Sequence, residues 1–165
     1  EFVYVELKKK FDGIVYKRRI PMRYEEAKKY LYNGIRPNMD SQILREIDYT
    51  LNFYQARPAV YLAYDRLAFY EKNNPDFRIT FDMNIRARQH VLELDKGVYG
   101  TLLMPWEMLL MEVKIPGAMP LWMSRILSEL DIYPTSFSKY GTYYQNYIEE
   151  STEKDFKERG VEICA

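Results

Sequence analysis

The feature that most constrains this chain is an unbroken alternation of apolar and polar residues over residues 77–88, FRITFDMNIRAR. Successive side chains of an extended strand point to opposite faces, so the stretch predicts one long strand with an apolar face and a charged face. The charged face is expected to carry Arg78, Asp82, Arg86 and Arg88. Three arginines beside one aspartate leave two interpretations: the face meets plain solvent, as in many antiparallel sheets, or it lines an anion site.

The composition narrows the possible partners and chemistry. The chain of 165 residues is 47% apolar, which is enough for one globular domain with a core. Its 24 basic and 24 acidic residues cancel, so the net charge does not indicate a nucleic acid partner. No apolar run approaches the roughly 18 residues that cross a bilayer. We therefore expect no membrane segment and a cytoplasmic, soluble domain that is part of a larger protein.

The small number of cysteines and histidines also limits the kinds of catalytic and metal site that the chain can form. Cys164 is the single cysteine and His90 the single histidine. An internal disulfide, a His-rich metal site and a Cys/His nucleophile pair are therefore excluded. Any chemistry must use carboxylates, lysines and arginines.

Four other stretches repeat the strand pattern with charge on one face. Residues 1–10 begin inside such a pattern, which leads us to expect a missing N-terminal portion, and Asp12-Gly13 predicts a tight turn into a return strand over residues 14–20. A strand that starts at Pro58 and a turn over residues 73–76 place Arg66 on the strand next to Arg78 and opposite it. Residues 109–115 predict a further strand. The charged faces of these four strands are expected to carry Glu6, Lys8, Lys10, Lys17, Arg19, Arg66, Glu112 and Lys114.

These strands predict an α+β fold together with helical patterns over residues 24–32, 41–54 and 120–130 and a Tyr-rich helix that follows residues 135–140 and ends near Glu150. If the sheet closes with its charged faces inward, it forms an antiparallel β-barrel tunnel with a basic, polar lumen and flanking helices. We expect the domain to cover residues 1–150, followed by a charged tail over residues 151–165.

A basic lumen suits phosphate. Arginine offers a planar fork that matches phosphate oxygens, and lysine adds a mobile point charge. A divalent metal carried by a polyphosphate needs an oxygen ligand from the protein, and Glu112 is the best candidate. Asp82 is better suited to hold a basic side chain in place. The sequence contains no Walker loop, no Gly-x-Gly-x-x-Gly and no Ser/His/Asp arrangement, so side chains must grip the phosphates.

Six segments of the sequence, taken together, resemble those of a known domain family. In chain order they are Glu6-Leu7-Lys8, Val15-Tyr16-Lys17-Arg18-Arg19, Tyr64-Asp65-Arg66-Leu67-Ala68-Phe69, Phe77-Arg78-Ile79-Thr80-Phe81-Asp82, Met111-Glu112-Val113-Lys114 and Ser136-Phe137-Ser138-Lys139-Tyr140. Together they resemble the VTC polyphosphate polymerase domain, a member of the triphosphate tunnel metalloenzyme (CYTH-like) superfamily, from residue 1 to about residue 147. The N-terminal strands of that family, with their Arg-x-Arg residues, have no counterpart in this sequence.

The resemblance implies a barrel whose basic walls bind ATP, triphosphate and polyphosphate and whose acidic residue holds Mn²⁺ or Mg²⁺. It implies catalytic phosphate ligands at Lys8, Lys17, Arg66, Arg78 and Lys114, a metal ligand at Glu112, and substrate binding by Ser138 and Lys139. To the substrate-binding set we add Arg19, Arg86 and Arg88, which share the charged faces.

Three functions remain open at this point. The leading one is a polyphosphate polymerase that moves the γ-phosphate of ATP onto a growing chain. The alternatives are hydrolysis of tripolyphosphate or a nucleoside triphosphate, with water as the acceptor, and non-catalytic polyphosphate binding. The sequence does not assign an oligomeric state.

Overall fold

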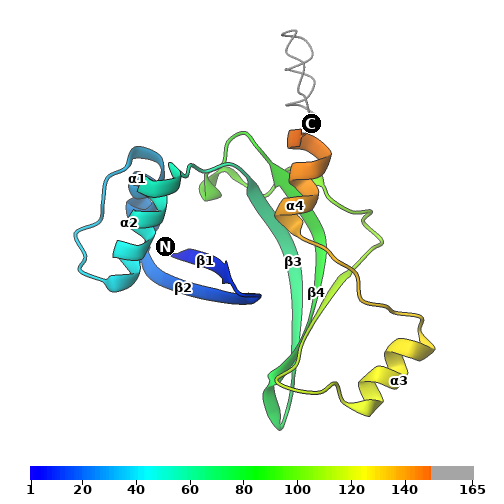
Figure 1. The fold of residues 1–165 in the computed structure, drawn as a ribbon. Coiled ribbons are helices and arrows are strands. Elements are labelled where there is room, and N and C mark those ends of the chain that lie inside the picture. Colours follow the sequence, from blue (N-terminus) through cyan, green and yellow to red (C-terminus); the bar gives the residue numbers. More distant parts are fainter. Residues whose placement is uncertain (150–165) are drawn as a thin grey trace, which may run out of the picture. The chain divides into compact units, whose positions relative to one another are not determined.

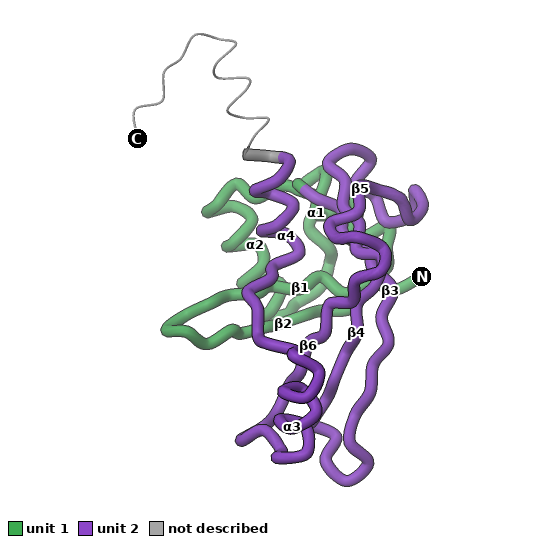
Figure 2. The backbone as a smooth tube through the Cα atoms, turned by 90° about the vertical axis from the view of Figure 1, so that its right-hand side faces the viewer, with its two compact units in different colours: residues 1–59 green, residues 60–165 purple. Residues whose placement is uncertain are grey.

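The computed structural model describes residues 1–149 and divides the chain into two compact units, Glu1–Ala59 and Val60–Ala165. Figure 1 shows the elements, and Figure 2 colours the two units separately. The fold is α+β with antiparallel sheets, as predicted. The predicted tail over residues 151–165 lies outside the described residues. None of the helices within residues 1–149 has both the length and the apolar character needed to span a bilayer.

Unit 1 contains β1 (Phe2–Phe11), β2 (Ile14–Arg23), α1 (Tyr24–Asn33) and α2 (Gln42–Tyr54). The strands form a hairpin through Asp12 and Gly13, whose φ angles of 48° and 75° suit the tight turn that the sequence predicts. One face of the hairpin packs on both helices, with Val5, Met22 and Leu44 in the core. The opposite face carries the basic residues, since Lys8 pairs with Lys17 and Glu6 with Arg19.

Unit 2 is built around the long strand that the alternation predicts, β4 (Asn74–Arg88). One edge of β4 pairs with β3 (Tyr61–Glu71), and the other edge pairs with β5 (Thr101–Leu102) and β6 (Leu110–Lys114). The remaining elements are η1 (Leu94–Lys96), α3 (Leu121–Glu129), α4 (Lys139–Tyr143) and the π-helical η2 (Tyr144–Glu149). Trp122 of α3 lies against the buried Phe77 of β4, with ring centroids 5.9 Å apart.

The predicted barrel is not confirmed. Within residues 1–149 the strands form one two-stranded and one four-stranded sheet, and neither sheet closes on itself. In the four-stranded sheet β3 pairs only with β4 among the described strands, which leaves its other edge open.

The pairing of β3 with β4 corrects one expectation about register. Arg66 and Arg78 do lie on adjacent antiparallel strands, but Arg66 is opposite Asp82, and Arg78 is opposite Tyr70. The two-residue turn between Glu71 and Asn74 starts earlier than the predicted turn over residues 73–76, so the partners along the hairpin differ.

A bulge in β4 corrects a second expectation. Between the pairs Ala63/Arg86 and Asp65/Met83, one residue of β3 faces two residues of β4, and Asn84 has a left-handed φ of 50°. A one-residue bulge reverses which residues point to each face. Arg86 and Arg88 therefore lie on the opposite face from Arg78 and Asp82, and the expectation that all four share one face is wrong.

The bulge predicts how residue 84 tolerates substitution. Both Asn84→Gly and Asn84→Ala remove the hydrogen bond from the Asn84 amide to Asp65, 2.8 Å long, so their comparison isolates the backbone. Only glycine adopts positive φ without strain, so the alanine variant should be less stable by about 1 kcal/mol. Urea unfolding measures the difference. Equal stability of the two variants would contradict a left-handed residue at this position.

Candidate functional site

Cross-strand pairing in unit 2 gathers a set of charged residues on one side of the sheet. Asp82 of β4 is opposite Arg66 of β3, and on the other edge of β4 Thr80 is opposite Glu112 and Arg78 is opposite Lys114. Directly opposed residues of antiparallel strands point to the same face. We call this side, with Arg66, Arg78, Thr80, Asp82, Glu112 and Lys114, the charged face. It confirms that Glu112 and Lys114 share a face with Arg78.

Asp82 is the centre of the charged face. Its side chain is fully buried, and it accepts two hydrogen bonds from Arg66, from Nε at 2.5 Å and from Nη2 at 2.7 Å. The Lys139 ammonium, at the start of α4, lies 2.7 Å from the second carboxylate oxygen. Asp82 thus holds basic side chains in place, as the sequence predicts.

The pKa values of this cluster follow from the contacts. Burial alone raises the pKa of Asp82, but the hydrogen bonds and charges of Arg66 and Lys139 outweigh burial and hold the pKa below its ordinary value. The hydrogen bond to Asp82 in turn raises the pKa of Arg66. Asp82 is therefore ionised, and Arg66 is charged, at neutral pH.

Tyr64 is a site residue that the sequence analysis missed. Its ring lies under two of the cations, with the Arg66 guanidinium 4.9 Å and the Lys139 ammonium 4.8 Å from the ring centroid. Such contacts stabilise and orient a cation. Tyr64 could have been predicted from strand alternation, because it lies two residues before Arg66 and therefore on the same face of the strand.

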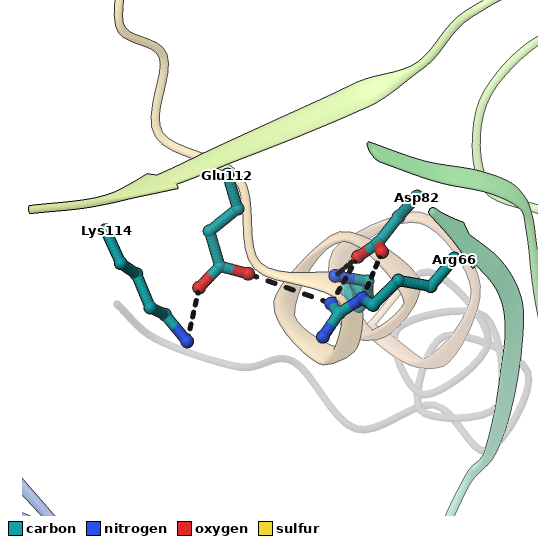
Figure 3. A network of polar contacts seen from close by, with 5 residues as sticks. Arg66, Asp82, Glu112 and Lys114 are labelled. Atoms are coloured by element: carbon teal, nitrogen blue, oxygen red, sulfur yellow. Dashed lines mark hydrogen bonds and ion pairs between the residues drawn. The ribbon is translucent and has the colours of Figure 1, made fainter. Parts of the chain in front are cut away.

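Glu112 is the accessible carboxylate of the charged face. It lies between Lys114 and Arg66 in Figure 3, 3.3 Å from the Lys114 ammonium and 3.8 Å from the Arg66 guanidinium. Its side chain is 44% exposed, whereas that of Asp82 is fully buried. A ligand arriving from solvent therefore meets Glu112 and not Asp82.

The exposed cations of the charged face are Arg78 and Lys114. Arg78 is exposed and has no ion pair within residues 1–149, and Lys114 is 52% exposed with only Glu112 as its partner. Four cations, counting Lys139, surround two carboxylates, so the face has a net positive charge. An unpaired arginine fork beside a lysine suits a phosphate oxygen acceptor.

The other predicted substrate-binding residues have different settings. Ser138 precedes α4, and its Oγ accepts a hydrogen bond of 3.1 Å from the Gly141 amide, which leaves its own proton to donate. Arg19 belongs to unit 1, where its guanidinium lies 4.5 Å from the centre of the Tyr4 ring. Lys8 and Lys17 are exposed and directly opposite each other on the same face of that unit.

Arg86 and Arg88 are not brought together with the charged face. Arg88 is buried, and it donates hydrogen bonds to the backbone carbonyls of Val91, Glu93, Gly97 and Tyr99. Arg86 donates to the carbonyl of Asn84 and to that of Val98. Both arginines fasten the segment that follows β4.

The charged face fits a metal ion that arrives with phosphate. Within the described part of the chain, no three or more His, Cys, Asp or Glu side chains gather as a metal site. Mg²⁺ and similar hard cations often use only one or two carboxylates and take the remaining oxygens from phosphate and water. Glu112, which is 44% exposed and makes two ion pairs within residues 1–149, is the carboxylate available for such a role, whereas Asp82 is fully engaged.

The family model of the VTC domain matches residues 1–148, which covers all of unit 1 and most of unit 2. The chain therefore belongs to the VTC domain family. This membership supports a function related to polyphosphate. Neither a search of the curated proteins nor a search of the solved structures found a match.

The buried carboxylate predicts a large and pH-dependent loss of stability in Asp82→Asn. The variant leaves Arg66 and Lys139 without their shared partner, so the free energy of unfolding should fall by about 3 kcal/mol at pH 7. The pKa of Asp82 is lowered in the folded state. The stability difference between the wild type and the variant is therefore fully present at pH values above the ordinary carboxyl pKa. It should shrink as the pH falls below about 4.

Chemical unfolding of both proteins from pH 7 to pH 3 measures this effect. Asp65→Asn is the matched control, because the Asp65 carboxylate is 61% exposed, its ion pair with Arg86 spans 3.8 Å, and an amide oxygen can still accept the hydrogen bond from Asn84. The control should change stability by less than about 1 kcal/mol. A loss in Asp82→Asn as small as in the control would contradict the central role of Asp82.

Proposed function

We propose that this protein is a polyphosphate polymerase, which transfers the γ-phosphate of ATP to the end of a polyphosphate chain. The observation that carries the proposal is the charged face of a VTC-family domain, where exposed cations surround one accessible carboxylate. Phosphoryl transfer requires mainly positioning and charge neutralisation, which such a face supplies.

Each cation has a definite way to bind phosphate. Asp82 occupies Nε and Nη2 of Arg66, so Nη1 remains for a phosphate oxygen. Arg78 offers its whole guanidinium, and Lys114 can exchange Glu112 for phosphate. The Lys139 side chain is more buried, with 19% of it exposed, and its ammonium adds positive charge next to Asp82. In unit 1 the exposed Lys8, Lys17 and Arg19 bind phosphate in the same way.

Glu112 would hold Mn²⁺ or Mg²⁺, which would supply positive charge to the phosphates when bound. In the reaction, a terminal oxygen of the chain forms a bond to the γ-phosphorus of ATP. The bond between that phosphorus and the β,γ-bridging oxygen breaks, and ADP leaves with the bond's electrons. Arg66, Arg78 and Lys114 hold the phosphates in line and neutralise charge on their oxygens.

Arg78→Ala tests the phosphate role with little risk to the fold, because Arg78 has no ion pair within residues 1–149. Synthesis of polyphosphate from ATP and Mn²⁺ should fall about 100-fold, as expected when one charge-stabilising donor is removed. The matched control is Arg125→Ala, another exposed arginine of unit 2, in α3. Equal activity of the two variants would count against the proposed site.

The products formed from ATP separate a polymerase from a hydrolase, and Glu112→Gln separates an enzyme from a binding module. The variant keeps the shape of the side chain but loses its charge, so metal-dependent turnover should be lost while tripolyphosphate still binds. Gel electrophoresis of the products and a free orthophosphate assay are the measurements. Long chains from the wild type support a polymerase. Orthophosphate alone indicates hydrolysis, and binding without turnover indicates a binding module; either result contradicts the proposal.

A further inference from the structure

The Thr80 hydroxyl stands out on the charged face, because Oγ1 is buried and has no hydrogen-bond partner within residues 1–149. A buried hydroxyl without a partner costs free energy, and native structures contain few of them. Neither the sequence pattern nor the phosphate contacts proposed above give this group a role.

Among the side chains that flank Thr80 or lie opposite it, one acceptor remains. On β4 it lies between Arg78 and Asp82, and Asp82 already receives its contacts from Arg66 and Lys139. On β3 the residue opposite is Ala68, which has no polar side-chain atom. On β6 the residue opposite is Glu112, whose contacts within the described chain are two ion pairs and no hydrogen bond.

Thr80 and Glu112 are close enough to interact. Directly opposed residues of antiparallel strands have Cβ atoms about 4.5–5.5 Å apart, within reach of a threonine hydroxyl and a glutamate carboxylate. Without a ligand, Glu112 is drawn toward Lys114 and Arg66, as Figure 3 shows. Both cations are among those that phosphate engages in the proposed function.

We propose that Thr80 is a positioning residue for Glu112, an inference that rests on the proposed function. When phosphate oxygens take Lys114 and Arg66, Glu112 loses both ion-pair partners. The Thr80 hydroxyl then donates a hydrogen bond to one carboxylate oxygen and leaves the other for the divalent cation. Such a partner fixes the orientation of a metal-binding carboxylate, and removing partners of this kind typically weakens metal affinity about 10–100-fold.

The test compares Thr80→Val, which keeps the shape and removes the hydroxyl, with Thr80→Ser, which keeps the hydroxyl. Calorimetry gives the affinity for tripolyphosphate with and without Mn²⁺, and the ratio of the two affinities measures the metal contribution. The ratio should fall about 10-fold in the valine variant and stay within about twofold of the wild type in the serine variant. The affinity without metal should be unchanged in both.

If Thr80 only stabilised the fold, removing its hydroxyl would lower the melting temperature and leave the affinity ratio unchanged. Thr80→Val removes a hydroxyl that has no hydrogen-bond partner in the described part of the chain, so the melting temperature of the variant should equal or exceed that of the wild type. If the valine variant does not fold, Thr80→Ala carries the same test. An unchanged affinity ratio in the variant without the hydroxyl overturns the role of Thr80.

Glu112→Gln distinguishes this failure from failure of the proposed function. A ratio that falls in Glu112→Gln but not in Thr80→Val overturns the Thr80 inference alone. A ratio unaffected by Glu112→Gln, or a wild type in which Mn²⁺ has no effect, overturns both the metal role of Glu112 and the positioning role of Thr80.

Discussion

The charged face of unit 2 depends on one buried carboxylate. Asp82 lies within the central strand and draws Arg66 from the neighbouring strand and Lys139 from the start of α4. It therefore ties together segments far apart in the sequence and fixes two cations that would otherwise be flexible. Both positive charges share one negative charge, so the cluster stays cationic while its geometry is set. The exposed Arg78 and Lys114 and the half-exposed Glu112 complete the face around this fixed centre.

Much of this arrangement could be predicted from the sequence, because strand alternation is a local property. It places Arg78 and Asp82 on one face, and the same rule places Glu112 with Lys114. The structural role of Asp82 could also be predicted, because a single carboxylate among several cations is expected to form ion pairs with them. The fold class and the turn at Asp12-Gly13 are equally local and are confirmed.

What could not be predicted depends on pairing between strands or on the path of the chain. The left-handed residue Asn84 leaves the apolar alternation of the sequence intact, yet it moves Arg86 and Arg88 to the other face. The partner of Arg66 depends on the hairpin register, which the turn sets. The approach of Lys139 to Asp82 bridges 57 positions of sequence and has no signal in either segment.

Arg88 shows how the chain after β4 is held, where the short η1 is the only regular element between Val91 and Tyr99. Its guanidinium binds four backbone carbonyls and lies 3.5 Å from the centroid of the Tyr61 ring and 4.1 Å from that of Tyr99. Every residue type has a backbone carbonyl, so most side chains in this segment are free to diverge during evolution while its path is kept. Gly100 is the exception, since a Cβ there would lie 2.5 Å from the carbonyl oxygen of Ala87.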